Sequence, residues 1–322
     1  MISETRLILG IGELLWDMLP EGARLGGAPA NFAVMAARLG DRAVILSRIG
    51  RDELGRQAME RLEPLPVDAS LVEVDGAHET GRVTVRFEEN EPHYTIHEPA
   101  AWDFLELAEE WIRLAERADA ICCGSLAQRN ETSRKTIQEL VGQTSAACVR
   151  VFDVNLRRPF YSGEVLQESL ELATVVKMNE AETPLVMELL GMPVPEGNGL
   201  GQTQKETRSG TGFLRRAAER LLAEFPDLEL VAITKGGSGS LLVNRDEWNE
   251  HSGFPVEVAD AVGAGDAFTA AMVHYLLRGA DLATLNGAGN RWGGWMASQT
   301  GAMPALPDAV RISIAAAIEA AN

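Results

Sequence analysis

The feature that most constrains the fold is an alternation of short apolar segments with longer amphipathic segments along most of the chain. Short apolar runs are typical of strands buried on both faces, whereas a 3.6-residue period indicates a helix with one apolar face. Strand, helix and strand in succession build a parallel sheet covered by helices. We therefore expect strands at residues 7–11, 44–49, 118–123, 149–154, 174–177 and 230–234, and helices at 28–39, 133–141, 163–172, 180–190 and 265–277.

Two regions depart from this alternation. Residues 80–87 alternate polar and apolar side chains, a turn follows, and residues 93–97 are again extended in character, which predicts an antiparallel hairpin with one face in solvent. Such an insertion is a candidate lid or dimerisation flap, and a purely decorative hairpin is the alternative. Residues 193–212 hold five glycines and few apolar side chains, which favours a mobile loop or a spacer between helices over a domain boundary.

Charge and cysteine content exclude several classes of protein. Lys and Arg number 29 against 47 Asp and Glu, and the formal net charge of −18 argues against general affinity for nucleic acid or anionic membranes. Three cysteines are too few for a disulfide framework. Residues 1–9 lack the apolar core of a signal peptide, and no apolar stretch is long enough for a membrane span. We expect a cytoplasmic protein without nucleic-acid or membrane partners.

The strongest chemical signal is the segment Asp260-Ala-Val-Gly-Ala-Gly-Asp266, which runs into a helical pattern. Small residues let backbone N–H groups converge, and the positive end of the following helix points to the same place, so the segment predicts an anion hole. Asp266 lies in the first turn of that helix, where a carboxylate can accept a hydroxyl proton. The alternative is an ordinary glycine-rich turn before an acidic helix terminus.

Polar residues beside two other segment ends suggest a site for hydroxyl groups. Gly26 and Gly27 precede the helix expected at 28–39, and Asn31 lies on its first turn. Glycine allows close approach of a ligand to the backbone, and an amide both donates and accepts hydrogen bonds. Asp17 follows the first strand and is a candidate for the same hydroxyl groups, with a plain turn aspartate as the alternative.

Two further strands end in residues suited to phosphate or nucleotide. The sequence Asp153-Val-Asn-Leu-Arg157 follows a buried strand, which is where ligands bind in open α/β sheets. The residues from Thr234 to Gly239 also follow a strand and suggest a turn that contacts a nucleotide, with a β-hairpin turn as the alternative. No Gly-Lys dipeptide occurs, which excludes a Walker A loop, so phosphate binding must depend on backbone amides and Arg157.

These motifs, taken in order, resemble the ribokinase-like (PfkB) family of carbohydrate kinases over nearly the whole chain. Its first signature is matched by Gly26-Gly27 with Asn31, Ala33, Gly40 and Gly50, and its second by residues 260–266. Residues 179–182 resemble its Asn-x-x-Glu motif, 234–239 its Thr-x-Gly-x-x-Gly turn, and 288–302 its adenine-side helix and loop. Within the family, residues 12–17, 26–31 and 124–129 look most like bacterial fructokinases.

The resemblance implies a three-layer α/β ribokinase-like fold with a mainly parallel central sheet flanked by helices. It implies one kinase domain over residues 1–322, with a small β lid from segments at about 13–25 and 80–100. In relatives this lid also builds a dimer, which makes a homodimer through the lid a further expectation.

The same resemblance implies roles for individual residues. For phosphoryl transfer these are Asp266 as the base, the backbone of Gly263, Ala264 and Gly265 as the anion hole, and Arg157 as a phosphate ligand. The implied sugar ligands are Asp17, Gly26, Gly27 and Asn31. The implied nucleotide contacts are Asn179, Thr234, Gly236, Gly239 and Asn290. The implied metal ligands are Glu182 for Mg²⁺, through water, and the backbone of Asp260 and Val262 for a monovalent cation such as K⁺.

The expected function is therefore an ATP-dependent sugar kinase that phosphorylates a primary hydroxyl group, with fructose as the preferred substrate. The residues do not separate fructose from 2-keto-3-deoxygluconate, ribose or a nucleoside. A sugar-binding sensor without turnover is the alternative of another class, and the presence of Asp266 argues against it. Ala261 stands where the family usually has Thr or Ser, which bears on the monovalent cation.

Overall fold

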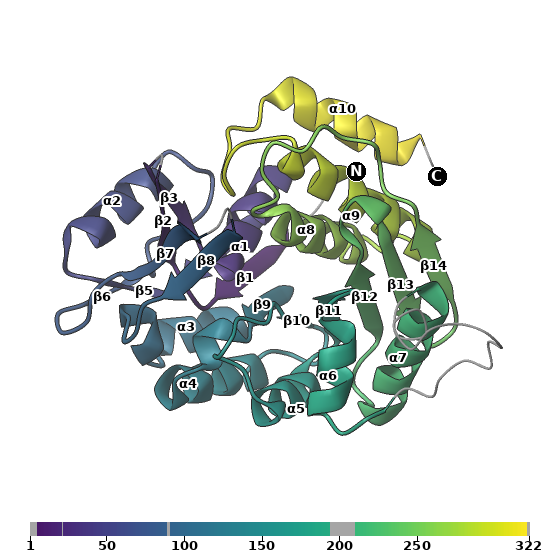
Figure 1. Cartoon of the computed structure of the whole chain (residues 1–322), viewed down its shortest axis with the longest axis horizontal. Coiled ribbons are helices and arrows are strands. Elements are labelled where there is room, and N and C mark those ends of the chain that lie inside the picture. The colour runs from purple at the N-terminus through teal and green to yellow at the C-terminus, as the bar shows by residue number, and fades with distance from the viewer. Residues whose placement is uncertain (1–4, 21, 89–90, 194–209, 321–322) are drawn as a thin grey trace.

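An eight-stranded sheet forms the centre of the molecule in the computed structural model, which describes residues 5–20, 22–88, 91–193 and 210–320 (Figure 1). Its strand order is β14-β13-β12-β11-β10-β9-β1-β4. The parallel strands are β1 (Leu7–Ile11), β4 (Arg42–Leu46), β9 (Ala120–Gly124), β10 (Val149–Asp153), β11 (Val175–Asn179) and β12 (Leu230–Thr234). An antiparallel edge follows with β13 (Ser240–Asn244) and β14 (Trp248–His251).

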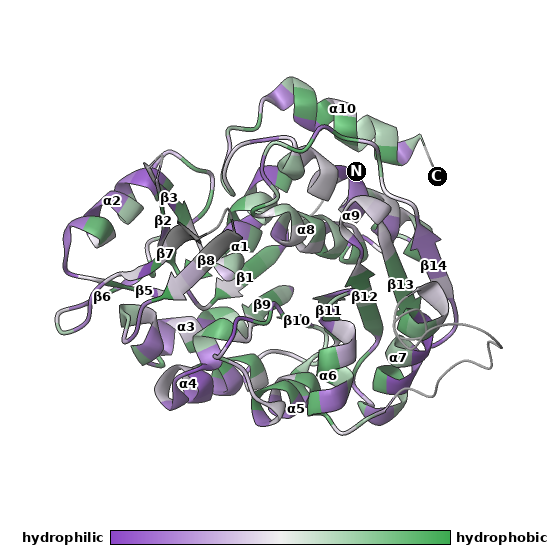
Figure 2. Ribbon diagram, viewed as in Figure 1, coloured by the Kyte–Doolittle hydropathy of each residue, from purple (hydrophilic) through white to green (hydrophobic). Residues whose placement is uncertain are grey.

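Helices cover both faces of this sheet. One layer consists of α1 (Ala28–Leu39), α8 (Ala264–Leu276) and α9 (Leu282–Ala297), with α10 (Asp308–Glu319) packed on α9. The other contains α3 (Glu109–Ala115), α4 (Glu131–Gly142), α5 (Gly163–Leu172), α6 (Thr183–Leu189) and α7 (Thr211–Glu224). Alternate residues of β1 face the two layers, since Ile8 packs with the first and Leu9 with the second. Figure 2 shows the apolar residues gathered in the strands between them.

A second, four-stranded sheet stands beside the first, with order β3-β2-β7-β8. It joins β2 (Leu15–Leu19) and β3 (Gly22–Gly26) to the hairpin of β7 (Gly81–Glu88) and β8 (Glu91–Ile96). The helix α2 (Glu53–Leu62) and the two-stranded pair β5 (Arg48–Gly50) and β6 (Glu73–Asp75) lie at the same end. Two segments far apart in the sequence thus form one sheet.

Most of the expected elements are present, and the differences have local causes. The strand expected at 44–49 is wrong as a single element, because the chain leaves the central sheet at Ser47, whose hydroxyl donates to the Gly12 carbonyl at 2.7 Å. The helix expected at 180–190 begins only at Thr183, because Asn179 and Glu182 bond to each other's backbone. The loop expected at 193–212 lies mostly outside the described residues.

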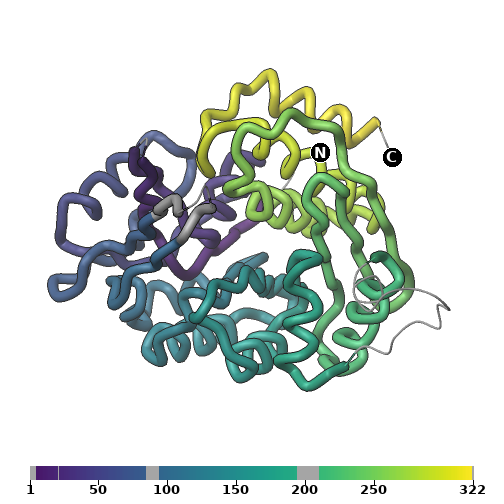
Figure 3. Tube along the Cα trace, viewed as in Figure 1, coloured from purple at the N-terminus to yellow at the C-terminus, as the bar shows by residue number. Residues whose placement is uncertain are grey.

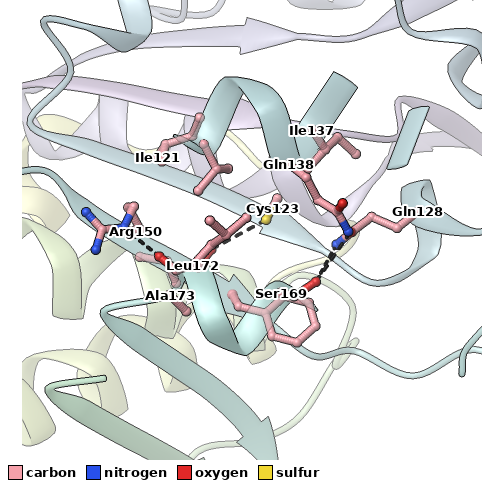
Figure 4. Close-up of a pocket in the computed structure, with 12 residues that line it drawn as sticks. Ile121, Cys123, Gln128, Ile137, Gln138, Arg150, Ser169, Leu172 and Ala173 are labelled. Carbon is pink, nitrogen blue, oxygen red and sulfur yellow. Dashed lines mark hydrogen bonds between the residues drawn. The ribbon is translucent and has the colours of Figure 1, made fainter. Parts of the chain in front are cut away.

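Two further expectations concern the interior. Cys122, Cys123 and Cys148 are free and buried, as small apolar side chains would be. A cavity of about 10 Å³ beside Cys123 lies between the sheet and helices α4 and α5, and the Gln128 amide donates to Ser169 there (Figure 4). It belongs to the core under the second helix layer. No helix in the described part of the chain has the length and apolarity that a membrane crossing requires.

Candidate active site

The anion-hole segment and the start of α8 form the centre of the candidate site. The chain between β14 and α8 crosses the molecule toward the second sheet before α8 begins (Figure 3). Gly263 caps the helix with φ 78°, and a Cβ there would lie 2.9 Å from Ala302 Cα. Only glycine fits this left-handed, crowded position without strain. The turn therefore fixes the direction of the N-terminus of α8, which carries a partial positive charge, at the place where Asp266 and Asn31 meet.

Asp266 and Asn31 meet at this point. The Asn31 amide donates from Nδ2 to Asp266 Oδ2 at 2.7 Å, although the residues are 235 positions apart. Asn31 is placed by Gly27, which precedes α1 with φ 117° and would bring a Cβ within 2.2 Å of the Glu13 carbonyl oxygen. The N-termini of α1 and α8 therefore meet at the Asp266 carboxylate. Its Oδ2 accepts from Asn31, and its Oδ1 takes no part in that hydrogen bond.

The surroundings of Asp266 determine its charge. Burial raises its pKa to about 6 and Asp153 acts in the same direction, while Lys177, the Asn31 hydrogen bond and Arg157 oppose the shift. Asp266 is therefore mainly ionised at neutral pH, yet basic enough to take up a proton during a reaction. A pKa shifted toward the working pH by burial and specific charges is typical of functional sites.

Two more carboxyl groups near this site have raised pKa values. Burial raises the pKa of Glu13 to about 7, and its Oε1 accepts from the Ala28 N–H at 3.2 Å. Burial likewise raises the pKa of Asp17 to about 6, against the attraction of Arg157 and Arg24. Asp17 lies in strand β2 and not in a turn, with Oδ2 3.2 Å from where a Cβ of Gly26 would be.

The raised pKa of Asp266 predicts a pH-dependent cost in stability. Between pH about 4 and 6 the folded chain holds this proton and the unfolded chain does not, so the free energy of unfolding falls as pH rises. Relative to Asp266→Asn, we expect the wild type to lose on the order of 2–3 kcal/mol from pH 4 to pH 7. Urea unfolding of both proteins across this range measures the difference, and a difference independent of pH would contradict the shift.

The Asn179–Glu182 motif joins the ends of two strands. The Glu182 carboxylate accepts from the Leu156 N–H and the Asn179 N–H, both at 2.8 Å, and Asn179 Oδ1 accepts from the Glu182 N–H at 2.9 Å. These bonds fix the turn after β10, where Asn155 has φ 39° and Arg157 is exposed. The charge of Arg157 lowers the pKa of Glu13, Asp17 and Asp266, against the larger effect of burial on each.

The nucleotide candidates gather at the end of β12. Thr234 ends this strand, and the short 3₁₀ turn Gly236–Ser238 leads into β13, so the hairpin alternative correctly describes the backbone here. The Asn290 amide donates to Ser240 Oγ at 2.6 Å and to the Asn286 carbonyl at 2.8 Å. Its nitrogen thus ties α9 to β13, beneath the turn.

Sequence reasoning missed three residues of this region. Lys177 lies buried in β11 and binds Asp153 through Nζ at 3.0 Å. Glu13 is buried beside Gly27, and Arg24 in β3 forms a 2.6 Å ion pair with Asp260. A charged residue within a buried apolar strand is costly, and that signal was available for Lys177. The contacts of Glu13 and Arg24 depend on the tertiary structure.

The sequence is similar to those of known carbohydrate kinases. A family model described as pfkB family carbohydrate kinase matches residues 22–309. A putative sugar kinase of Pyrococcus horikoshii is 30% identical over 298 residues, covering 87% of this chain and 86% of that protein. A fructokinase of Escherichia coli is 29% identical over 282 residues, covering 82% of each.

Solved structures have the same fold. The Pyrococcus horikoshii sugar kinase in complex with ATP superposes with a TM-score of 0.74 at 27% identity, covering 92% of this chain and 94% of that one. Fructokinase from Vibrio cholerae, with fructose, ADP and calcium ion bound, gives 0.75 at 26% identity, covering 96% and 99%. A double mutant of that fructokinase has fructose, ADP and potassium ion bound and gives 0.75 at 25% identity, covering 96% and 98%.

Proposed function

Because the chain belongs to the PfkB family of carbohydrate kinases, we propose that it transfers the γ-phosphoryl group of MgATP to a primary hydroxyl group of fructose. The observation that supports this proposal most is the 2.7 Å contact of Asn31 with Asp266 at the N-terminus of α8, which suits a base beside the proposed anion hole. Fructokinases among the relatives and the fructose-bound Vibrio cholerae enzyme support fructose over other sugars.

Asp266 acts as the base in this proposal. Asn31 holds Oδ2, which leaves Oδ1 to accept the hydroxyl proton while the sugar oxygen attacks the γ-phosphorus. The bond from phosphorus to the β–γ bridging oxygen breaks, and ADP leaves with the electron pair. Asp17, Gly26, Gly27 and Asn31 hold the sugar, so that its hydroxyl group is oriented before transfer. Positioning and charge stabilisation supply most of the rate in phosphoryl transfer.

The backbone at the start of α8 receives the charge of the transferred group. Gly265 and Asp266 occupy helical positions whose N–H groups have no intrahelical acceptor, and Ala264 precedes them. Together with Gly263, these residues form the proposed anion hole, and the exposed Arg157 neutralises further phosphate charge. Asn179, Thr234, Gly236, Gly239 and Asn290 are the proposed nucleotide contacts.

The proposed metal ions are Mg²⁺, bound to the protein through water, and a monovalent cation bound by backbone carbonyl groups. Among the described residues no three His, Cys, Asp or Glu side chains form a metal cluster, and both oxygens of Glu182 already accept backbone N–H groups. Mg²⁺ is therefore proposed to arrive with the nucleotide and to meet Glu182 through water. When bound, it neutralises phosphate charge. The backbone carbonyls of Asp260 and Val262 are the proposed ligands of a monovalent cation.

The second sheet is proposed to be the lid of a single kinase domain that covers the sugar. Asp17 and Arg24 lie on its strands β2 and β3, and Arg24 pairs with Asp260 of the anion-hole segment. A homodimer through this sheet belongs to the same proposal, and Tyr94 of β8 is an exposed aromatic residue of the sheet.

Coupled ADP release with MgATP tests the proposed function. The panel contains fructose, ribose, 2-keto-3-deoxygluconate, adenosine and fructose 6-phosphate. We expect fructose to give the highest kcat/KM, by at least about tenfold. A higher value for another member would replace fructose as the substrate. Calorimetric sugar binding without ADP release would instead favour the non-catalytic sensor.

A further inference from the structure

A buried ammonium group lies beside the anion-hole segment. Lys177 Nζ donates to Asp153 Oδ1 and Oδ2, both at 3.0 Å, and the two side chains are only 9% and 6% exposed. The same nitrogen lies 2.8 Å from where a Cβ on Gly265 would be. The ammonium therefore uses the space that a side chain at residue 265 would fill.

The carboxylates around Lys177 keep it charged. Burial opposes its charge, but Asp153, Asp266 and Glu182 together raise its pKa above the ordinary value. Thr269 of α8 adds a link, since its hydroxyl oxygen lies 2.9 Å from the Gly265 carbonyl and 3.2 Å from Asp153 Oδ2, and its one proton can go to either acceptor. The Lys177 ammonium thus interacts electrostatically with both Asp266, the proposed base, and Glu182, the proposed ligand of Mg²⁺ through water.

Stability does not explain a pair of this kind. Taking both charges out of water costs several kcal/mol per ion, and well-packed neutral residues often stabilise a protein as well or better. In the proposed reaction negative charge develops at the start of α8, beside this pair, and a fixed charge acts more strongly in a buried site than in solvent.

We propose that Lys177 completes the anion hole, as a fixed positive charge beside Gly265 that Asp153 holds in place and that stabilises the phosphoryl group during its transfer. The inference rests on the proposed function. Lys177 forms no bond and takes no proton, since the hydroxyl proton goes to Asp266 and the electron pair of the broken bond to ADP. It is therefore neither base nor nucleophile, and it acts through its charge alone.

Three variants separate this role from a structural one. Lys177→Met removes the cation but leaves Asp153 buried and unpaired, which risks unfolding. The double variant Lys177→Met with Asp153→Asn replaces the charged pair by two uncharged side chains, and the oxygen of the new amide can still accept from Thr269. Asp153→Asn alone is the matched control, because it removes one member of the pair and retains the ammonium.

We expect kcat to fall about 10²–10³-fold in the double variant, with KM for ATP within about threefold of the wild type and Tm within a few degrees. Asp153→Asn is expected to lose less rate than the double variant. Aluminium fluoride mimics the transferred phosphoryl group. In the double variant, affinity for MgADP together with aluminium fluoride and fructose should fall with kcat, while affinity for MgADP alone should not.

A folded double variant with kcat within about threefold of the wild type would overturn the inference and leave the pair a structural contact. Equal losses of affinity for MgADP alone and for MgADP with aluminium fluoride would overturn it too. The proposal of fructose fails separately, when the wild type prefers another acceptor in the panel. The same comparison of variants is then made with that acceptor.

Discussion

The Asp266→Asn variant is expected to lose phosphoryl transfer while its binding of sugar and nucleotide stays nearly intact. An amide cannot accept the hydroxyl proton, but its oxygen can still accept the bond from Asn31 that the carboxylate now receives at 2.7 Å. Loss of a general base costs about 10²–10⁴-fold in rate, and we expect kcat to fall by that factor. Coupled ADP release measures kcat, and calorimetry measures binding of fructose and of MgADP.

The matched control is Asp308→Asn. Asp308 also lies in the first turn of a helix, α10, but its side chain is 87% exposed and pairs with Arg311 of the same helix. The same chemical change there should leave kcat unaltered. If Asp266→Asn kept more than a tenth of the wild-type kcat, the assignment of Asp266 as the base would be wrong.

The largest loss of stability is expected from Asp103→Ala. Asp103 accepts two bonds from the Arg129 guanidinium, both at 2.7 Å, and the paired side chains are only 3% and 4% exposed. The guanidinium lies 4.0 Å from the Trp102 ring centroid and donates to the His97 carbonyl at the end of the second sheet. Removing the carboxylate leaves a buried unpaired cation, which costs about 3–5 kcal/mol. Urea unfolding measures the change.

Glu109→Ala serves as the matched control for Asp103→Ala. Glu109 pairs with Arg113 on helix α3, but the two side chains are 90% and 63% exposed. Exposed helix pairs contribute about 0.3–0.5 kcal/mol, so its removal should change the free energy of unfolding little. Similar small losses in both variants would show that the Asp103–Arg129 pair is not effectively buried in solution.

Local patterns were enough to predict much of the fold and the centre of the site. Helix α1 and strand β12 coincide with the residues expected from apolar periodicity and turn residues. Asp266 was identified from its place at a helix start after small residues, because such a segment can bind an anion and the carboxylate beside it can accept a proton. The antiparallel strand β13 was only an alternative interpretation of the turn at 234–239, and β14 was not expected, because hydrophobic patterns do not reveal strand direction.

The missing parts depend on contacts between distant segments. The Asp153–Lys177 pair joins neighbouring strands, and no periodicity within either strand says which side chain faces the other. The orientation of Asn290 is set by Ser240, which lies in a strand on the sheet beneath it. Burial and pairing of polar groups are properties of the packed structure, so only the residue types, and not their partners, were available from the sequence.

The ion pair of Arg24 with Asp260 connects the second sheet, which holds the proposed sugar ligand Asp17, to the segment that precedes the proposed anion hole. The same Asp260 oxygen also accepts from the Gly301 N–H at 3.1 Å, which brings the chain after α9 into this contact. A ligand on one side that strengthens the pair changes affinity on the other side, and thermodynamic linkage makes that coupling reciprocal. If binding of one substrate changes the affinity for the second by a given factor, binding of the second changes the affinity for the first by the same factor.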